Sequence, residues 1–124
     1  MPARVATVAA SKLSKSYAQM RGARSFCINI LAEDQRRICT QFARSGSDKW
    51  IDVAWRLSPG GSPILEGALA WIDCRREVEH EAGDHYLTIG RITGLKAHSG
   101  RPLLYYRSDY AVLPALASES AAAS

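Results

Sequence analysis

Five short apolar segments, separated by polar and turn-forming residues, constrain the fold of this chain more than any other feature of its sequence. Each segment is rich in small, β-branched or aromatic residues and predicts a buried β-strand. Because short strands must pair with one another and bury a face, the pattern favours an antiparallel barrel or sandwich. The predicted strands cover residues 5–10, 26–31, 68–74, 86–92 and 103–107.

Two short helices are predicted between these strands, over residues 17–22 and 33–43. In the second helix, Ile38 and Phe42 lie four residues apart and therefore share one face. Two acidic residues begin this helix, where the positive end of the helix dipole favours them. The predicted fold class is mainly β with short helices, and the helices lie on the rim of the barrel or sandwich.

Several other stretches are predicted to lack regular structure. Residues 47–63 are expected to be irregular and rich in turns, and residues 96–102 to form a loop. Residues 77–84 are acidic and predict a turn region. The small and polar residues 113–124 show no periodicity and predict a disordered tail, so a single domain is expected to cover residues 1–112.

The composition is that of a soluble globular domain, since 47% of the 124 residues are hydrophobic and 23% are charged. No apolar run approaches the roughly 18 residues of a transmembrane helix, and the N-terminus lacks the features of a signal peptide. We therefore expect a cytoplasmic protein without a membrane partner. The net charge of +4 is scattered along the chain rather than massed on one segment, so no nucleic-acid partner is expected.

The three cysteines, Cys27, Cys39 and Cys74, are odd in number and form no CxxC pair. The three histidines do not complete a zinc pattern with them, so no metal site is predicted. Cys27 and Cys74 fall in predicted strands, where a free thiol packs as a small hydrophobe. Reduced, structural cysteines are the expectation for a cytoplasmic protein.

Four segments, in the same order along the chain, resemble the flavin reductase family with the FMN-binding split-barrel fold. The first is residues 14–17 followed by 26–32 (FCINILA), and the second is residues 42–46 at the end of the predicted helix. The third is residues 63–74, with the sequence PILEGALAWIDC. The fourth combines Gly83-Asp84-His85, Gly90-Arg91-Ile92 and Leu104-Tyr105-Tyr106-Arg107.

This resemblance implies an FMN-binding split β-barrel and, with it, an activity. Family members have a helix and further strands before the point at which Met1 and Pro2 begin to match, so we expect an N-terminally truncated barrel. The resemblance implies an NAD(P)H:flavin oxidoreductase, which transfers hydride from NADH or NADPH to FMN or FAD. It would be the small reductase component of a two-component system, with diffusible reduced flavin reaching a partner monooxygenase.

Ser14, Lys15 and Ser16 are the candidate residues for binding the flavin phosphate. Two hydroxyls and a cation follow a predicted strand and precede a predicted helix, which suits an anion. The alternative is that Ser14 or Ser16 simply caps the helix, as such residues do in many soluble proteins.

The resemblance places His85 beside the flavin, where it helps to receive the nicotinamide nucleotide and is the candidate catalytic residue. Asp84 is grouped with the cofactor-binding residues and would orient His85 or cap the turn. The alternative is that Asp84 and His85 are surface turn residues without a role in binding. Tyr106 and Arg107 would approach the flavin from the last strand, although an aromatic residue in a strand often packs across it.

The expected assembly is a homodimer or higher oligomer, because an open barrel exposes strand edges that a partner must cover, here near Val5. A second hypothesis stays open: a truncated, non-catalytic split-barrel protein that binds flavin weakly or acts through oligomerisation. A heme- or pyridoxine-related split barrel is a third class, and the segments at residues 63–74 and 83–85 argue against it.

Overall fold

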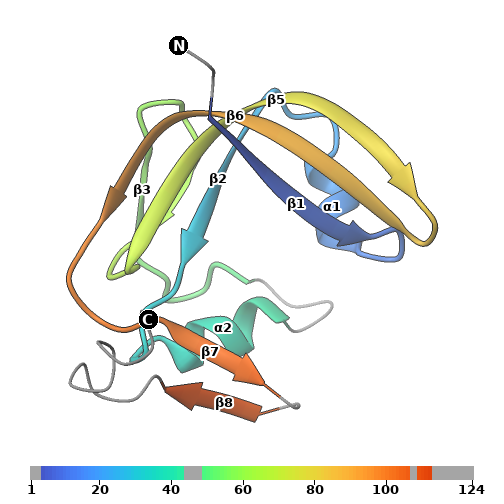
Figure 1. Cartoon of the computed structure of the whole chain (residues 1–124). Coiled ribbons are helices and arrows are strands. Elements are labelled where there is room, and N and C mark those ends of the chain that lie inside the picture. Colours follow the sequence, from blue (N-terminus) through green and yellow to red (C-terminus); the bar gives the residue numbers. More distant parts are fainter. Residues whose placement is uncertain (1–3, 44–48, 107–108, 113–124) are drawn as a thin grey trace, which may run out of the picture.

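The computed structural model describes residues 4–43, 49–106 and 109–112, and Figure 1 shows a curled sheet with short helices and hairpins beside it. Among the described residues, no helix is long and apolar enough to cross a membrane. The mainly β fold class is confirmed. In chain order the elements are β1 (Val5–Ser11), α1 (Lys15–Met20), β2 (Ser25–Ile30), α2 (Arg36–Ala43), β3 (Trp55–Leu57), β4 (Pro63–Leu65), β5 (Ala70–Ala82), β6 (His85–Ala97), β7 (Leu103–Tyr106) and β8 (Asp109–Val112).

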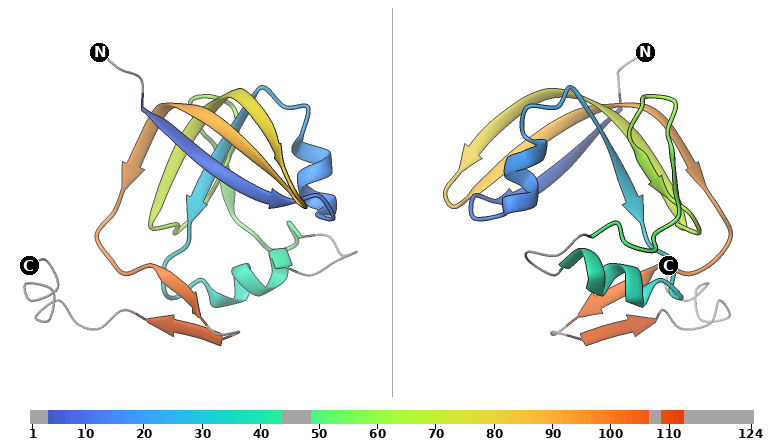
Figure 2. Two further views of the ribbon diagram at one scale, coloured as in Figure 1. Left: turned by 45° about the vertical axis from the view of Figure 1, so that its right-hand side comes forward. Right: turned by 180° about the vertical axis from the view of Figure 1, so that it is seen from behind.

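A four-stranded antiparallel sheet in the order β1-β6-β5-β2 forms the half-barrel. Its centre is the β5–β6 hairpin, whose two strands have 13 residues each. The register shifts between Asp73 and Cys74 and again between Arg76 and Val78, and such irregularities bend and twist a strand. Both views in Figure 2 show the sheet arching over the rest of the chain. The strands β3 and β4, and likewise β7 and β8, form separate two-stranded sheets.

Close packing between β2, β5 and β6 depends on a glycine. Phe26 on β2 is 7% exposed and Cys74 on β5 is 2% exposed. A Cβ atom added to Gly90 on β6 would lie 2.7 Å from Phe26 Cζ and 2.9 Å from Cys74 Cβ. Carbon atoms do not approach so closely unless one of them is displaced. Only glycine therefore fits at position 90 while Phe26 and Cys74 keep their places.

A second apolar cluster joins α2 to the segments that surround it. Val53, Leu65 and Ala68 are buried, and Ile38 and Phe42 of α2 pack against them together with Leu31. The predicted shared face of Ile38 and Phe42 is therefore confirmed. This cluster lies between α2 and the β3–β4 region rather than inside the four-stranded sheet.

A buried carboxylate ties the β3–β4 loop to β5. Asp73 is 2% exposed, and its two oxygens accept hydrogen bonds from the Ser58 hydroxyl at 2.7 Å and from the Gly60 amide at 2.8 Å. The Ser58 hydroxyl oxygen in turn accepts a hydrogen bond from the Ser62 amide at 3.0 Å. A buried carboxylate is tolerated when its lone pairs are used in this way, so Asp73 fixes the loop against the sheet.

The acidic stretch 77–84 is not a turn region, contrary to the prediction. β5 continues to Ala82, and only Gly83, with a φ of +62°, begins the turn into β6. Glutamates fit inside the strand because two of them form ion pairs with arginines on neighbouring elements. β6 likewise runs to Ala97 and takes in the first residues of the loop predicted at 96–102.

Both helices begin at residues other than those predicted. α1 starts at Lys15, earlier than expected, because the Ser14 side chain caps it. α2 starts at Arg36, later than expected, and its first turn holds no acidic residue. The preceding residues form a turn instead, in which the Ala32 amide donates to the Gln35 side-chain oxygen at 2.9 Å.

Three of the eight strands in the described part of the chain, β3, β4 and β8, were not predicted. Each has three or four residues, too few to display the alternation that identifies a strand in a sequence. The last predicted strand exists as β7 and ends at Tyr106. Arg107 and the predicted tail at 113–124 lie outside the described residues.

Replacing Gly90 with Ala tests the packing between β2, β5 and β6. We expect the free energy of unfolding to fall by roughly 1–3 kcal/mol, because the added methyl group overpacks the contact with Phe26 and Cys74. Urea unfolding followed by tryptophan fluorescence measures the change. The matched control is Gly22→Ala, whose Cβ meets no atom within 4 Å. Equal stability of the two variants would contradict this account of the core.

Candidate functional site

The end of β1 and the turn of the β5–β6 hairpin lie side by side. Ser11, the last residue of β1, pairs with His85, the first residue of β6. The Lys12 amide donates a hydrogen bond to the Asp84 carbonyl at 2.9 Å. The residues that lead into α1 are therefore anchored next to the Asp84–His85 turn, although they lie far from it in the sequence.

Ser14 is the N-cap of α1. Its hydroxyl oxygen accepts a hydrogen bond from the Tyr17 amide at 3.1 Å, which satisfies one of the free amides of the first turn. The Ser14 amide itself donates to the Ser11 carbonyl at 3.0 Å. The capping alternative therefore describes what Ser14 does in this structure, and its hydroxyl hydrogen stays available to a further acceptor.

Ser16 and Lys49 form a hydroxyl–ammonium pair on the first turn of α1. Lys49 Nζ donates a hydrogen bond to Ser16 Oγ at 2.7 Å. Lys15, which precedes Ser16 in the sequence, is exposed and forms no ion pair with any residue that the structure describes. An ammonium group bound to a hydroxyl, with a second lysine next to it in the sequence, is a donor set that suits an anion such as phosphate. Ser14, Lys15, Ser16 and Lys49 are called the anion site below.

At the turn between β5 and β6, the imidazole ring of His85 is oriented by the Asp84 side chain. His85 Nδ1 lies 2.8 Å from Asp84 Oδ1, and the Asp84 side chain is 92% exposed. The hydrogen bond and the charge of His85 lower the pKa of Asp84 below its ordinary value. This contact fixes one ring nitrogen, so Nε2 of the half-buried His85 ring is the nitrogen left for another partner.

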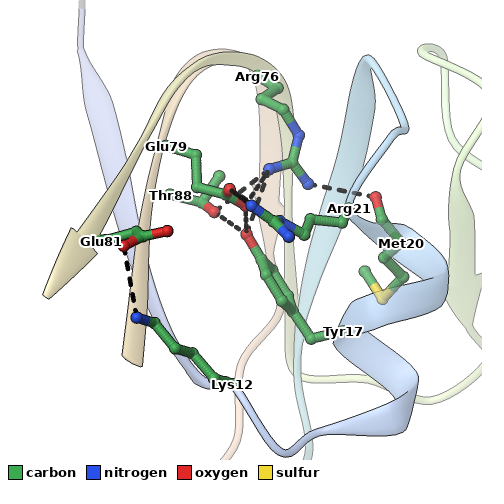
Figure 3. A network of polar contacts seen from close by, with 8 residues as sticks. All are labelled: Lys12, Tyr17, Met20, Arg21, Arg76, Glu79, Glu81 and Thr88. Atoms are coloured by element: carbon green, nitrogen blue, oxygen red, sulfur yellow. Dashed lines mark hydrogen bonds and ion pairs between the residues drawn. The ribbon is translucent and has the colours of Figure 1, made fainter. Parts of the chain in front are cut away.

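A network of polar side chains holds α1 against the β5–β6 hairpin, as Figure 3 shows. The hydroxyl of Tyr17 lies 2.6 Å from Glu79 Oε2 and contacts the Thr88 hydroxyl. Arg21 pairs with Glu79 at 2.8 Å. Arg76 donates to both the Tyr17 and the Thr88 hydroxyl oxygens at 3.3 Å. Tyr17, Arg21, Arg76, Glu79 and Thr88 are called the polar clamp below.

The polar clamp lowers the pKa of Glu79 below its ordinary value of 4.5. The main cause is the hydrogen bond from the Tyr17 hydroxyl, followed among the favourable causes by the hydrogen bond and charge of Arg21. Partial burial acts in the opposite direction. The hydrogen bond with Glu79 in turn raises the pKa of Arg21. The clamp therefore contains an ionised carboxylate between two arginines at neutral pH.

Two cations lie over the ring of Tyr86, the residue that follows His85. The Arg21 guanidinium carbon is 4.0 Å and Lys12 Nζ is 5.3 Å from the ring centroid. Lys12 also pairs with Glu81 at 3.6 Å. Cation–π contacts of this kind hold the positive charges near the hairpin turn.

The structure brings together most, but not all, of the residues predicted from the sequence. The anion-site residues Ser14 to Ser16 and the Asp84–His85 turn share one end of the four-stranded sheet. Tyr106 ends β7, in a two-stranded sheet separate from the four-stranded one. The Leu103 amide at the start of β7 donates to the Leu31 carbonyl, directly after β2, at 2.9 Å. Arg107 lies outside the described residues, so the predicted roles of Tyr106 and Arg107 stay predictions.

A cavity of about 540 Å³ lies at the opposite end of the β5–β6 hairpin, where Ala70 pairs with Ala97. Its lining includes residues 66–69 and 98–101. Neither Ser14, Lys15 and Ser16 nor the Asp84–His85 turn is among its described lining residues, so these predicted residues and the cavity are separate features of the described chain.

Lys49 and Arg76 were not found from the sequence. Lys49 is 33 residues from Ser16, in a stretch without regular pattern, and no local signal links the two. Residues 77–81 alternate glutamates with Val78 and His80, which fits a strand better than a turn. Strict alternation places Arg76 on the face opposite Glu79, so their contact at 3.5 Å, beside the register shift between Arg76 and Val78, had no sequence signal.

The family model described as the flavin reductase like domain matches residues 1–114 of the chain. The chain belongs to this family. The expected resemblance is thereby confirmed.

Similar proteins of this flavin reductase family include two whose sequences are more than 40% identical. The reductase subunit HsaB of a flavin-dependent monooxygenase from Rhodococcus jostii (strain RHA1) is 44% identical over 101 residues, which cover 81% of this chain and 52% of HsaB. A flavin reductase from Pseudomonas putida is 43% identical over 98 residues, covering 78% of this chain and 58% of that protein. The chain thus spans about half the length of these relatives.

The crystal structure of nitrilotriacetate monooxygenase component B from Mycobacterium thermoresistibile is similar in fold. It matches with a TM-score of 0.84 at 35% sequence identity, over 89% of this chain and 63% of that chain. The split-barrel fold predicted for this flavin reductase family member is therefore confirmed.

The Glu79→Gln variant tests the electrostatics of the polar clamp. A carboxylate with a lowered folded-state pKa stabilises the folded protein above its ordinary pKa of 4.5, and this stabilisation is lost as the pH falls through the lowered value. We therefore expect the variant to be less stable than the unaltered protein at neutral pH, with a difference that shrinks in acid.

Urea unfolding at a series of pH values between about 7 and 3 measures this difference. The matched control is Glu81→Gln, on the same strand, because the Glu81 side chain is 71% exposed and its contribution is expected to be small. A stability loss in Glu79→Gln that is the same at every pH would contradict the assigned ionisation.

Proposed function

We propose that this chain functions as an NAD(P)H:flavin oxidoreductase, which transfers hydride from NADH or NADPH to FMN or FAD. The single observation that carries this proposal is the proximity of the anion site to the Asp84–His85 turn on a flavin reductase fold. The anion site suits a cofactor phosphate, and the His85 ring at the turn offers a nitrogen to a second nucleotide.

The residues of the anion site fit a flavin phosphate. Lys49 and Lys15 supply positive charge, and the hydroxyls of Ser16 and Ser14 supply donors around them. The bound flavin would supply the ring that accepts the hydride, and the protein needs to bind and orient it. FMN and FAD both carry phosphate, so this donor set suits either flavin.

His85 is the proposed contact for the nicotinamide nucleotide. Asp84 holds Nδ1, and this leaves Nε2 to hydrogen-bond a group on the second substrate. Hydride transfer needs no nucleophile or general base, so the task of His85 is to position the nicotinamide against the flavin. Asp84 would act through His85 by fixing the orientation of its ring.

The proposed partner is a flavin-dependent monooxygenase that takes up diffusible reduced flavin. HsaB is the reductase subunit of a flavin-dependent monooxygenase, and the similarity to it supports the same role here. The chain spans about half the length of these relatives, so their role is proposed for it rather than carried over.

The proposed assembly is a homodimer or higher oligomer in which a second copy covers the edge of β1. β1 pairs with β6 on one side, and its other edge has no strand partner among the described residues. Val5 is 53% exposed, and no charged side chain interrupts the strand between Arg4 and Lys12. A neutral edge of this kind favours pairing with another chain.

His85→Ala tests the proposed activity. We expect FMN to bind to the unaltered chain with saturable quenching of its fluorescence, and we expect NADH oxidation to follow. In the variant, FMN binding should persist while the rate of NADH oxidation falls about tenfold or more, because one positioning contact is lost.

The matched control is His80→Ala, an exposed histidine on β5, which should oxidise NADH at the unaltered rate. Failure of the unaltered chain to bind FMN at high protein concentration would overturn the proposed function. It would favour the non-catalytic split-barrel protein instead.

Size-exclusion chromatography with light scattering tests the proposed assembly. The unaltered chain is expected to elute as a dimer or larger species. Thr7→Lys, which places a charge in the middle of the β1 edge, should shift the equilibrium toward monomer. Ser99→Lys, in an exposed loop, is the charge-matched control. A clean monomer of the unaltered chain at micromolar concentration would contradict the proposal.

A further inference from the structure

We propose that Arg76, a residue of β5 that touches no part of the anion site, is the positioning residue that holds α1 and thereby places that site. The identity of the anion as a flavin phosphate rests on the proposed function. The mechanical claim, that Arg76 holds α1 in place on the sheet, rests on the contacts of Arg76 alone.

α1 cannot hold its own position. It has six residues, and a helix this short is unstable by itself because one turn fixes many backbone angles for few hydrogen bonds. Tyr17 is its one buried residue. The place of the helix on the sheet must therefore be set by contacts from outside it.

Arg76 supplies contacts at the C-terminal end of α1. Its Nη2 donates to the Met20 carbonyl at 3.3 Å, and its Nε donates to the Ala23 carbonyl at 2.9 Å. Carbonyls at the end of a helix lack partners within the helix, and a cation there is favourable to the helix dipole. Arg76 thus caps the helix from a neighbouring strand.

The same guanidinium also reaches the middle of the helix. Arg76 Nη1 donates to the Tyr17 hydroxyl and to the Thr88 hydroxyl at 3.3 Å, and it lies 3.5 Å from Glu79 Oε2. The Arg76 side chain is 15% exposed, so water replaces few of these partners. Figure 3 shows the guanidinium beside the Tyr17 hydroxyl, with a contact to the Met20 carbonyl at the end of α1.

The anion site lies at the other end of the same helix. Ser14 caps its first turn and Ser16 binds Lys49 within that turn. A shift or loosening of α1 moves both hydroxyls relative to Lys49, whose carbonyl is held by the Gln41 side chain of α2 at 2.8 Å. Arg76 therefore acts on the anion through the helix, without contact.

Lysine is not an adequate substitute at this position. The planar guanidinium directs Nε, Nη1 and Nη2 to separate acceptors at once, whereas an ammonium group has its three donors on one atom. Arg76→Lys keeps the charge and most of the length, so it separates the bridging geometry from simple charge. Arg75→Lys, at an exposed neighbouring position, is the matched control.

Amide hydrogen exchange of the full chain tests the mechanical claim. In Arg76→Lys, the amides of α1 are expected to exchange about tenfold faster, because local opening of the helix is favoured, while those of β6 keep their rates. Arg75→Lys should exchange like the unaltered protein. Equal protection of α1 in both variants would overturn the proposal, whether or not the chain binds flavin.

Titrations with FMN and with riboflavin, which lacks the phosphate, test the effect on the anion site. In Arg76→Lys the Kd for FMN is expected to rise about tenfold, as for one lost charge-assisted hydrogen bond, with an unchanged Kd for riboflavin. An unchanged Kd for FMN, or an equal loss for both ligands, would overturn the positioning role. Absence of FMN binding in the unaltered chain would defeat the proposed function, and the exchange rates would still decide the mechanical claim.

Discussion

The pairing of β5 with β6 is the interaction on which the remaining structure depends. This hairpin occupies the centre of the sheet, with β1 added on one side and β2 on the other. It supplies Asp73 to the β3–β4 loop, Gly90 to the core contact and Arg76 to α1. The elements of the candidate site are therefore held by the same two strands: β1 pairs with β6, and α1 is bound by Arg76 on β5.

The hairpin stabilises its polar residues by giving each a partner on another element. Glu79 would be unfavourable in the middle of a sheet without Tyr17 and Arg21, and Asp73 would be unfavourable without Ser58. Polar groups of this kind tie elements together at defined positions, whereas apolar packing alone permits more sliding. The result is a short helix held at a fixed place beside the hairpin turn.

Much of the fold could be predicted from the sequence, and the errors have physical causes. Strands with a clear apolar pattern, such as those around Val8 and Ile28, were placed to within a residue or two. The second half of β5 was missed because its charges resemble those of a turn until their partners are known. Of the candidate site, Ser14, Ser16 and His85 were identified through the family resemblance, while Lys49 was not.

The sequence by itself determined the fold class and the family, because apolar alternation and the order of four segments are local properties of the chain. Only the tertiary structure decided which distant residues meet. Ser16 meets Lys49, and α1 meets Arg76, through hydrogen bonds between segments separated by tens of residues. Such contacts depend on the register of the strands and on the curvature of the sheet. Neither can be derived from the pattern of residues within a single segment.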